Sequence, residues 1–200
     1  MEKWIVRHKT SDGIVTWLTK TADGKIEYFR QPIFAVAAKS YEEARWAARL
    51  GIFEVEEEIP VVSIGDAMKK EYFVRPSHTM RLNNFEEAFQ NATHRIAGEQ
   101  YIGGQEHFYL EGQVSLATPT EDGGMRLFVS TQHPTEIQKI VAEVLGISMN
   151  KITVETRRMG GGFGGKETQA AQWAGLAAIM AHKTKRSVLF RLARADDMTI

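Results

Sequence analysis

The clearest periodic signals lie in the second half of the chain. Apolar residues over 134–145 recur at helical spacing and form one face, with Pro134 suited to the first turn and Gly146 to the end. The pattern therefore predicts a helix over 134–145. A second helix is predicted over about 166–182, where alanines at helical spacing are typical of a helix that packs closely against its neighbours.

Short apolar or alternating runs, bounded by turn-forming residues, are typical of β-strands. The predicted strands cover residues 4–6, 14–18, 33–38, 53–56, 95–101, 113–117, 125–130, 151–156 and 187–192. The first two indicate a hairpin, and the third is apolar enough to be buried on both faces. A turn over 119–124 joins the strands on either side of it.

The order of these elements predicts a mixed fold. Ser40 and Glu43 match a capping box, so a helix is expected to begin there and to end at Gly51. This helix lies between two predicted strands, which makes the first part of the chain one α/β unit. A connecting segment over 61–74 follows, with a short helical turn near 65–68.

We place a domain boundary near residues 65–80. The expected fold class is α+β (mixed α/β), with the end of a small α/β domain over residues 1–70 and a second domain over 71–200. Strands and helices do not alternate strictly enough for a wholly parallel sheet.

The composition of the chain excludes several classes of function. The 200 residues are 43% hydrophobic and 25% charged, and their formal net charge is zero, which is typical of a globular chain and argues against a nucleic-acid partner. The absence of cysteine excludes disulfides, thiolate metal sites and Fe–S ligands within this chain. No apolar run approaches the length of a membrane span and no signal-peptide core is visible, so a cytoplasmic protein is expected.

A cluster of glycines is the strongest chemical signal. Residues 160–165 contain five glycines in six positions, between a predicted strand and a predicted helix. Glycine allows backbone conformations barred to other residues, and the N-terminus of the following helix carries a partial positive charge. This arrangement indicates a cradle for an anion or a phosphate. The alternative is a tight turn that needs only small residues.

Two nucleotide-binding patterns match only in part. Gly160, Gly162 and Gly165 fit the dinucleotide fingerprint, but Asp196 lies too far along to be its acidic partner. The same loop fits a phosphate-binding G-x-x-x-x-G-K pattern, but Glu167 stands where Ser or Thr would hold Mg²⁺. A nucleotide-binding module therefore stays an alternative.

Phe163 and Glu167 favour a small-molecule site. A large ring inside a glycine loop suits the wall of a packed pocket, and Glu167 is expected in the first turn of the helix. The histidines are scattered without the spacing of metal ligands.

Several sequence blocks resemble the molybdenum hydroxylases, the xanthine dehydrogenase and aldehyde oxidase family. These blocks, in family order over about residues 28–200, are Gln31–Val36, Gly103–Glu111 (GGQEHFYLE), Ser130–Pro134, Val144–Gly146 and Arg158–Glu167 (RMGGGFGGKE). The amino-acid sequence around Gln105 and Glu167 favours the xanthine dehydrogenase branch.

The resemblance implies roles for six residues. Gln105 and the glycine-loop residues Gly161, Gly162, Phe163 and Gly164 are similar to residues that bind the molybdenum–molybdopterin cofactor. Gln105 and Phe163 would lie near the molybdenum without being direct protein ligands, and hence close to each other. Glu167 is similar to the glutamate that contacts a purine substrate. No catalytic residue is expected within this chain, because the family's general-base glutamate matches no position in it.

The resemblance also implies partners. FAD and [2Fe–2S] clusters would lie on other domains or subunits, and electrons from purine hydroxylation would pass to them. We therefore expect an incomplete, molybdopterin-binding part of a xanthine dehydrogenase-like oxidoreductase that acts on hypoxanthine or xanthine. Two alternatives are an aldehyde oxidase-like enzyme and a non-catalytic truncated domain that serves as an assembly element.

Overall fold

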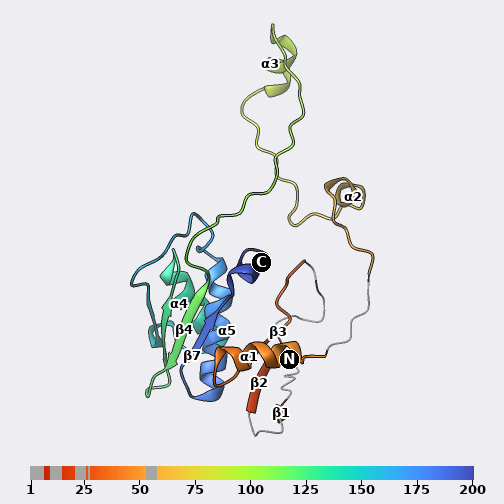
Figure 1. Cartoon of the computed structure of the whole chain (residues 1–200). Helices are drawn as coiled ribbons and strands as arrows, with labels where there is room; N and C mark the ends of the chain where they lie inside the picture. Colours follow the sequence, from red (N-terminus) through yellow and green to blue (C-terminus); the bar gives the residue numbers. More distant parts are fainter. Residues whose placement is uncertain (1–6, 10–14, 21–25, 27, 53–57) are drawn as a thin grey trace. The chain divides into compact units, whose positions relative to one another are not determined.

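A computed structural model describes residues 7–9, 15–20, 26, 28–52 and 58–200 (Figure 1). Contacts divide the chain into two units, which are described separately below. One unit comprises residues 1–51 and 105–200, and the other comprises residues 52–104.

The larger unit is built on a four-stranded sheet. Its strands, in spatial order, are β6 (Ile152–Glu155), β5 (Met125–Val129), β4 (Val114–Pro119) and β7 (Val188–Arg191). Strands β5 and β6 are parallel, whereas β4 runs antiparallel to both of its neighbours. The sheet is therefore mixed, as the α+β (mixed α/β) prediction requires.

Two helices pack on this sheet and enclose the main core. Helix α4 spans Pro134–Leu145 and helix α5 spans Gln169–Thr184. Leu127 of β5, Ile137 of α4 and Ala174 of α5 are fully buried in one apolar cluster. Alanines on the inner face of α5 let this helix approach the sheet and α4 closely, which explains the alanine pattern in the sequence.

Local signals set the ends of α4. Pro134 occupies the first turn, where its missing N–H costs nothing, and Gly146 follows the helix with a φ of 67°. A short 3₁₀ helix, η1 (Met149–Lys151), then leads into β6. The helix predicted over 134–145 is confirmed at both ends.

The first part of the same unit forms a separate antiparallel sheet. Its strands are β1 (Arg7–Lys9), β2 (Val15–Lys20) and β3 (Phe34–Ala37). Helix α1 (Tyr41–Arg49) follows with the predicted capping box, in which the Glu43 N–H donates to Ser40 Oγ at 3.2 Å and the Ser40 N–H donates to Glu43 Oε2 at 3.0 Å. Ala35 of β3 packs in an apolar cluster with side chains of α5.

A short helix ends the chain. Helix α6 (Arg194–Asp197) follows β7, and Asp197 within it is buried. Its carboxylate accepts hydrogen bonds from the Tyr109 hydroxyl and the Gln113 N–H, both at 3.1 Å. These bonds fix α6 to the segment that precedes β4.

The smaller unit contains two short helices, α2 (Ile64–Lys69) and α3 (Phe85–Asn91). Its described residues, 52 and 58–104, include no buried side chain. Phe85 and Phe89 stack on each other with ring centroids 5.7 Å apart, but both rings remain exposed. Within the residues that the structure describes, no helix has the length and apolar character needed to cross a membrane.

Two sequence expectations about strands need correction, and others stay untested. The strand predicted over 95–101 is wrong, because that segment has no ladder partner and its side chains are exposed, so alternation alone did not produce a strand. The run 33–38 was expected to be buried on both faces, but only Ala35 of β3 is buried, since one face alone packs against α5. The predicted strands 4–6 and 53–56 lie outside the described residues, and the domain limits 1–70 and 71–200 stay a prediction.

Candidate functional site

The glycine loop links β6 to α5 and turns through unusual backbone angles. Gly161, Phe163 and Gly164 have positive φ values of 102°, 55° and 92°. The Gly165 N–H donates to the Gly162 carbonyl at 2.8 Å, which closes a tight turn around Phe163. Glycine carries no penalty at such angles, whereas the non-glycine Phe163 is held there by the turn.

Three of the glycines have no room for a side chain. A Cβ atom on Gly162 would lie 2.5 Å from Gln132 Oε1, and one on Gly165 would lie 2.7 Å from the Tyr109 ring. A Cβ on Gly160 would meet Glu111 at 2.5 Å. Close packing by the chain's own side chains therefore requires small residues here, which supports part of the tight-turn alternative.

Glu111 holds the start of the loop. Its Oε2 atom accepts hydrogen bonds from the Gly160 N–H at 2.8 Å and from the Ser130 hydroxyl at 2.6 Å. Its own N–H donates to the Gly160 carbonyl at 3.1 Å. Partial burial alone would raise the pKa of Glu111, but these two donors and the Lys166 ammonium outweigh it and hold the pKa below its ordinary value.

Lys166 lies at the other end of the loop and is fully buried. Its Nζ donates to the Glu111 carbonyl at 2.6 Å and to Ser130 Oγ at 2.7 Å, and it lies 3.4 Å from Glu111 Oε2. It also lies 4.6 Å from the centre of the Tyr109 ring. Burial lowers the pKa of Lys166, against the opposing effect of Glu111.

Gln132 holds the middle and the end of the loop. Its Oε1 atom accepts from the Gly164 N–H at 3.0 Å and from the Lys166 N–H at 3.2 Å. The Lys166 carbonyl in turn accepts from the Gln132 N–H at 2.8 Å and from the Thr131 hydroxyl at 3.0 Å. The Ser130–Pro134 sequence block thus positions the loop from the end of β5.

The hydrogen bonds that hold the two ends of the glycine loop do not involve the N–H groups in its middle. Within the described part of the chain, the N–H groups of Gly161, Gly162 and Phe163 have no hydrogen-bond acceptor, whereas those of Gly160, Gly164, Gly165 and Lys166 do. Successive free N–H groups in a chain with positive φ angles form a concave site that attracts anions and carbonyl-like oxygens.

A second cluster supports the loop from behind. The Gln113 side-chain amide donates to the Gly165 carbonyl at 3.0 Å and to the Tyr109 hydroxyl at 3.1 Å. Arg194 donates to the Tyr109 carbonyl. Burial raises the pKa of Tyr109, and the nearby carboxylate of Asp197 acts in the same direction. The Tyr109 ring is thereby fixed against the back of the loop.

The sequence-predicted residues fall into two groups. Gly161, Gly162, Phe163 and Gly164 form the loop with the free N–H groups. Gln105 is exposed, two residues before His107, whose ring would lie 2.9 Å from a Cβ on Gly165. The segment that carries Gln105 therefore reaches the loop, but closeness of the Gln105 and Phe163 side chains stays a prediction.

Phe163 and Glu167 are exposed. The Phe163 side chain is 76% accessible, so within this chain it does not line an enclosed pocket. Glu167 was expected in the first turn of the helix, but α5 begins at Gln169, and Glu167 lies two residues before it. The turn that closes the glycine loop extends through Lys166 and delays the helix.

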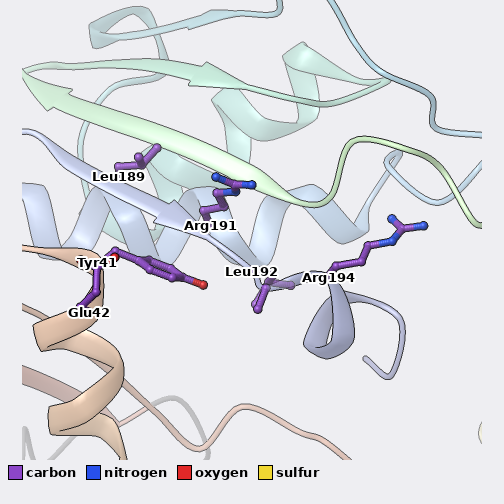
Figure 2. Close-up of a pocket in the computed structure, with 7 residues that line it drawn as sticks. Tyr41, Glu42, Leu189, Arg191, Leu192 and Arg194 are labelled. Atoms are coloured by element: carbon purple, nitrogen blue, oxygen red, sulfur yellow. The ribbon is translucent and has the colours of Figure 1, made fainter.

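The two described hollows lie elsewhere, beside α1 and β7. The larger, about 510 Å³, is lined by Tyr41, Glu42, Leu189, Arg191, Leu192, Ala193 and Arg194. Figure 2 shows the Tyr41 ring extending from α1 toward β7, with the Leu189 and Arg191 side chains on the other side of that strand in this view. A second hollow of about 380 Å³ adjoins it. Neither is lined by a predicted site residue.

Sequence reasoning did not assign roles to Glu111, Gln132 and Lys166. Glu111 and Gln132 stand inside the quoted blocks, so their position in those motifs was the available signal. Lys166 stands inside the Arg158–Glu167 block as well, but its burial could not be inferred from that block, because lysine is ordinarily solvated and its burial depends on partners far apart in the sequence. No group of three His, Cys, Asp or Glu residues in the described part of the chain has metal-binding geometry.

Comparison with protein families identifies the family of this chain. The profile of the molybdopterin cofactor-binding domain matches residues 66–200. The chain belongs to this molybdopterin cofactor-binding family. The family resemblance seen in the sequence blocks is thereby confirmed, and the glycine loop and its supporting residues lie inside the matched range.

The relatives of this family member include two kinds of enzyme. A xanthine dehydrogenase/oxidase of Gallus gallus is 40% identical over 189 residues, which cover 94% of this chain and 14% of that protein. Aldehyde oxidase 3 of Rattus norvegicus is 41% identical over 172 residues, which cover 85% of this chain and 13% of that protein. The chain thus spans about one seventh of these relatives, and identity does not separate the two branches.

Solved structures agree on the fold. Quinoline 2-oxidoreductase from Pseudomonas putida 86 matches with a TM-score of 0.68 and 22% identity over 84% of this chain and 22% of that one. Aldehyde oxidoreductase from Desulfovibrio gigas matches with a TM-score of 0.68 and 24% identity, over 84% of this chain and 19% of that one. The mixed α/β fold of this chain is therefore one that both of these longer chains contain.

Proposed function

We propose that this chain supplies the glycine-loop part of a molybdopterin site in a xanthine dehydrogenase-like molybdenum hydroxylase. The observation that carries the proposal is the row of free N–H groups on Gly161, Gly162 and Phe163, inside the matched family range. The cofactor is rich in hydrogen-bond acceptors, and three adjacent donors in a rigid loop fit such a group.

The residues of this chain would bind and orient. The loop N–H groups would hold acceptor atoms of the cofactor, with Gln105 donating from the segment that reaches the loop. The exposed Phe163 ring would become buried against the bound group and exclude water from it. When bound, the molybdenum centre supplies the oxidation chemistry, and the protein contributes position and electrostatics.

Glu167 is the proposed contact for a purine. Its exposed carboxylate follows the loop directly, where it can accept hydrogen bonds from ring N–H groups of hypoxanthine or xanthine. The hydroxylation of a purine also needs an electron route, which we place on FAD and [2Fe–2S] groups of other domains or subunits. The same proposal includes a cytoplasmic assembly.

Cofactor binding can be measured directly. The chain is purified from cells that make molybdopterin, and the pterin released after oxidation is measured by fluorescence, together with molybdenum per chain. We expect bound pterin in the wild-type chain and a loss in Gly162→Ala, whose methyl group would displace Gln132. Gly175→Ala in α5, where the added methyl has ordinary space, is the matched control. A wild-type chain without pterin contradicts the proposal.

Substrate choice is tested on the pterin-loaded chain by calorimetric titration with xanthine and with benzaldehyde. Loss of a charged hydrogen-bond acceptor in Glu167→Gln should weaken xanthine binding about tenfold. Glu121→Gln, in the exposed turn between β4 and β5, should bind as the wild type does. Benzaldehyde binding without xanthine binding would instead favour the aldehyde oxidase branch.

An assembly role is the second candidate, and the smaller unit favours it. Large apolar side chains over residues 52–104 are exposed, including Phe73, Phe85 and Ile96. Contiguous exposed apolar surface commonly marks a site where another protein surface packs. A chain that binds no pterin but associates with other parts of a hydroxylase through this unit would support this candidate.

A further inference from the structure

The burial of Lys166 raises a question that the proposed function leaves open. This side chain has no exposed surface, although burying an ammonium group is costly unless it is fully paired. All three of its N–H donors have acceptors: the Glu111 carbonyl, Glu111 Oε2 and Ser130 Oγ. A group retained at such a cost, and so completely paired, points to a specific structural task.

The partners of Lys166 connect it to the opposite end of the glycine loop. Ser130 Oγ receives the Lys166 ammonium at 2.7 Å and donates its own proton to Glu111 Oε2 at 2.6 Å. That same carboxylate oxygen accepts the Gly160 N–H at 2.8 Å. Glu111, Ser130 and Lys166, here called the Lys166 cluster, thus form one continuous hydrogen-bonded path from the last residue of the loop to its first.

The backbone of Lys166 closes the loop from the other side. Its N–H and carbonyl are both bonded to Gln132, which also binds the Gly164 N–H. The loop from Gly160 to Lys166 is therefore held at both ends by interactions that meet at one residue. The free N–H groups all lie between these two attachment points.

We propose that Lys166 is a positioning residue: through Glu111 and Ser130 it fixes the glycine loop in the conformation that keeps the N–H groups of Gly161, Gly162 and Phe163 available. The cluster places charge and hydrogen bonds behind the loop, so the loop is ordered before any ligand binds. Preorganised donors lose less entropy on binding and so bind more tightly. For the ligand, this inference rests on the proposed molybdopterin site.

A simpler explanation is that Lys166 only fills space. The Lys166 side chain is fully buried, and an uncharged side chain of similar size would fill the same volume. Lys166→Met separates the two roles, because it keeps most of the volume and removes the ammonium. Glu111→Gln removes the opposing charge but keeps an oxygen that can accept the Gly160 N–H.

The test is hydrogen–deuterium exchange on the 200-residue chain without ligand. Lys166→Met should raise exchange of the hydrogen-bonded loop amides, those of Gly160, Gly164, Gly165 and Lys166, about tenfold and leave the amides of α4 unchanged. Glu111→Gln should raise the exchange of these amides by a smaller factor. In the double variant, the second substitution should raise loop exchange by less than it does alone. With both the ammonium and the carboxylate removed, neither charge is left without its partner. Lys139→Met, an exposed lysine on α4, is the control and should change nothing in the loop.

Three outcomes would overturn the inference. They are unchanged loop exchange in Lys166→Met, equal loosening of the loop and α4, and simple additivity of the two substitutions. Should Lys166→Met not fold, Ser130→Ala removes only the hydroxyl between the two charges and carries the same expectation for the loop. Unchanged loop exchange in that variant would also contradict the proposal.

The ligand side has its own readout. Pterin content, measured as above, should fall at least severalfold in Lys166→Met and remain in Lys139→Met. Retention of full pterin content in Lys166→Met would contradict the positioning role. If the wild-type chain holds no pterin, the proposed function fails, whereas the exchange measurement still decides whether Lys166 orders the loop.

Discussion

At the scale of single residues, the glycine loop answers two demands at once. Gly160, Gly162 and Gly165 are needed because side chains of the same chain fill the space where a Cβ would stand. Gly161 and Gly164 are needed for their positive φ angles. The first demand is one of packing and the second one of backbone conformation, and together they leave three free N–H groups in a fixed geometry.

The packing demand predicts the result of adding one methyl group. In Gly162→Ala the new Cβ would lie 2.5 Å from Gln132 Oε1, so Gln132 must move and release the N–H groups of Gly164 and Lys166. We expect a loss of about 1–3 kcal/mol in the free energy of unfolding, measured by urea denaturation. Gly175→Ala, with ordinary space inside α5, should gain up to about 1 kcal/mol. Equal effects of the two substitutions would contradict this account.

The low pKa of Glu111 predicts a pH dependence of stability. Because the folded pKa lies below the ordinary value of 4.5, the contribution of this carboxylate is complete above that value and is lost as the pH falls through the folded value. The stability difference between wild type and Glu111→Gln should therefore shrink between about pH 6 and about pH 3. Glu143→Gln, an exposed residue of α4, should differ little from wild type at any pH. A constant difference for Glu111→Gln would count against the paired carboxylate.

At the scale of elements, local sequence signals succeeded where they were strong. Helix α4 and the capping box of α1 were predictable because proline, glycine, serine and glutamate act on the backbone next to them. The strand expected over 95–101 did not form because a strand needs a neighbour, which local alternation does not report. Helices α3 and α6 were not predicted, since one is an isolated short helix and the other depends on long-range bonds to Asp197.

The candidate site also has one part that the sequence indicated and one part that it did not. The glycine loop was visible in the sequence because composition alone marks it. Its supports were not, because Lys166 is joined to Gln132 and to Glu111 only by the fold, across 34 and 55 positions. Burial of a lysine reverses the ordinary expectation for that residue type, so no local pattern could have signalled it.

The close packing of α5 gives a prediction at this scale. Ala174 is fully buried in the main core, where the helix lies against the sheet and α4. Ala174→Leu should destabilise the chain by about 1–3 kcal/mol, because the larger side chain forces the two helices and the sheet apart. Gln172→Leu introduces the same residue at an exposed position of the same helix and should change stability by less than about 0.5 kcal/mol. Thermal unfolding followed by circular dichroism distinguishes the two.

At the scale of the whole molecule, the two units differ in how far they bury apolar side chains. The larger unit buries them in two clusters around α5. The smaller unit leaves its large apolar side chains exposed and has no buried side chain among its described residues. A segment of this kind gains little from burial to offset the entropy of ordering its chain.

Limited proteolysis tests this difference. Trypsin needs an open backbone, and Lys69, Arg81 and Arg95 lie in the smaller unit, where short helices and exposed segments give little protection. We expect the first cuts there, seen by intact-mass spectrometry as fragments that end at residue 200 and begin within residues 70–96. Lys139 and Lys151 are also exposed but belong to elements of the packed unit, so cuts at these sites should come later. Early cleavage at Lys139 or Lys151 would mean that the main core, and with it the framework behind the glycine loop, opens as readily as the smaller unit. If a hydroxylase surface covers the smaller unit in its assembly, the same cuts should slow when that assembly is digested under identical conditions.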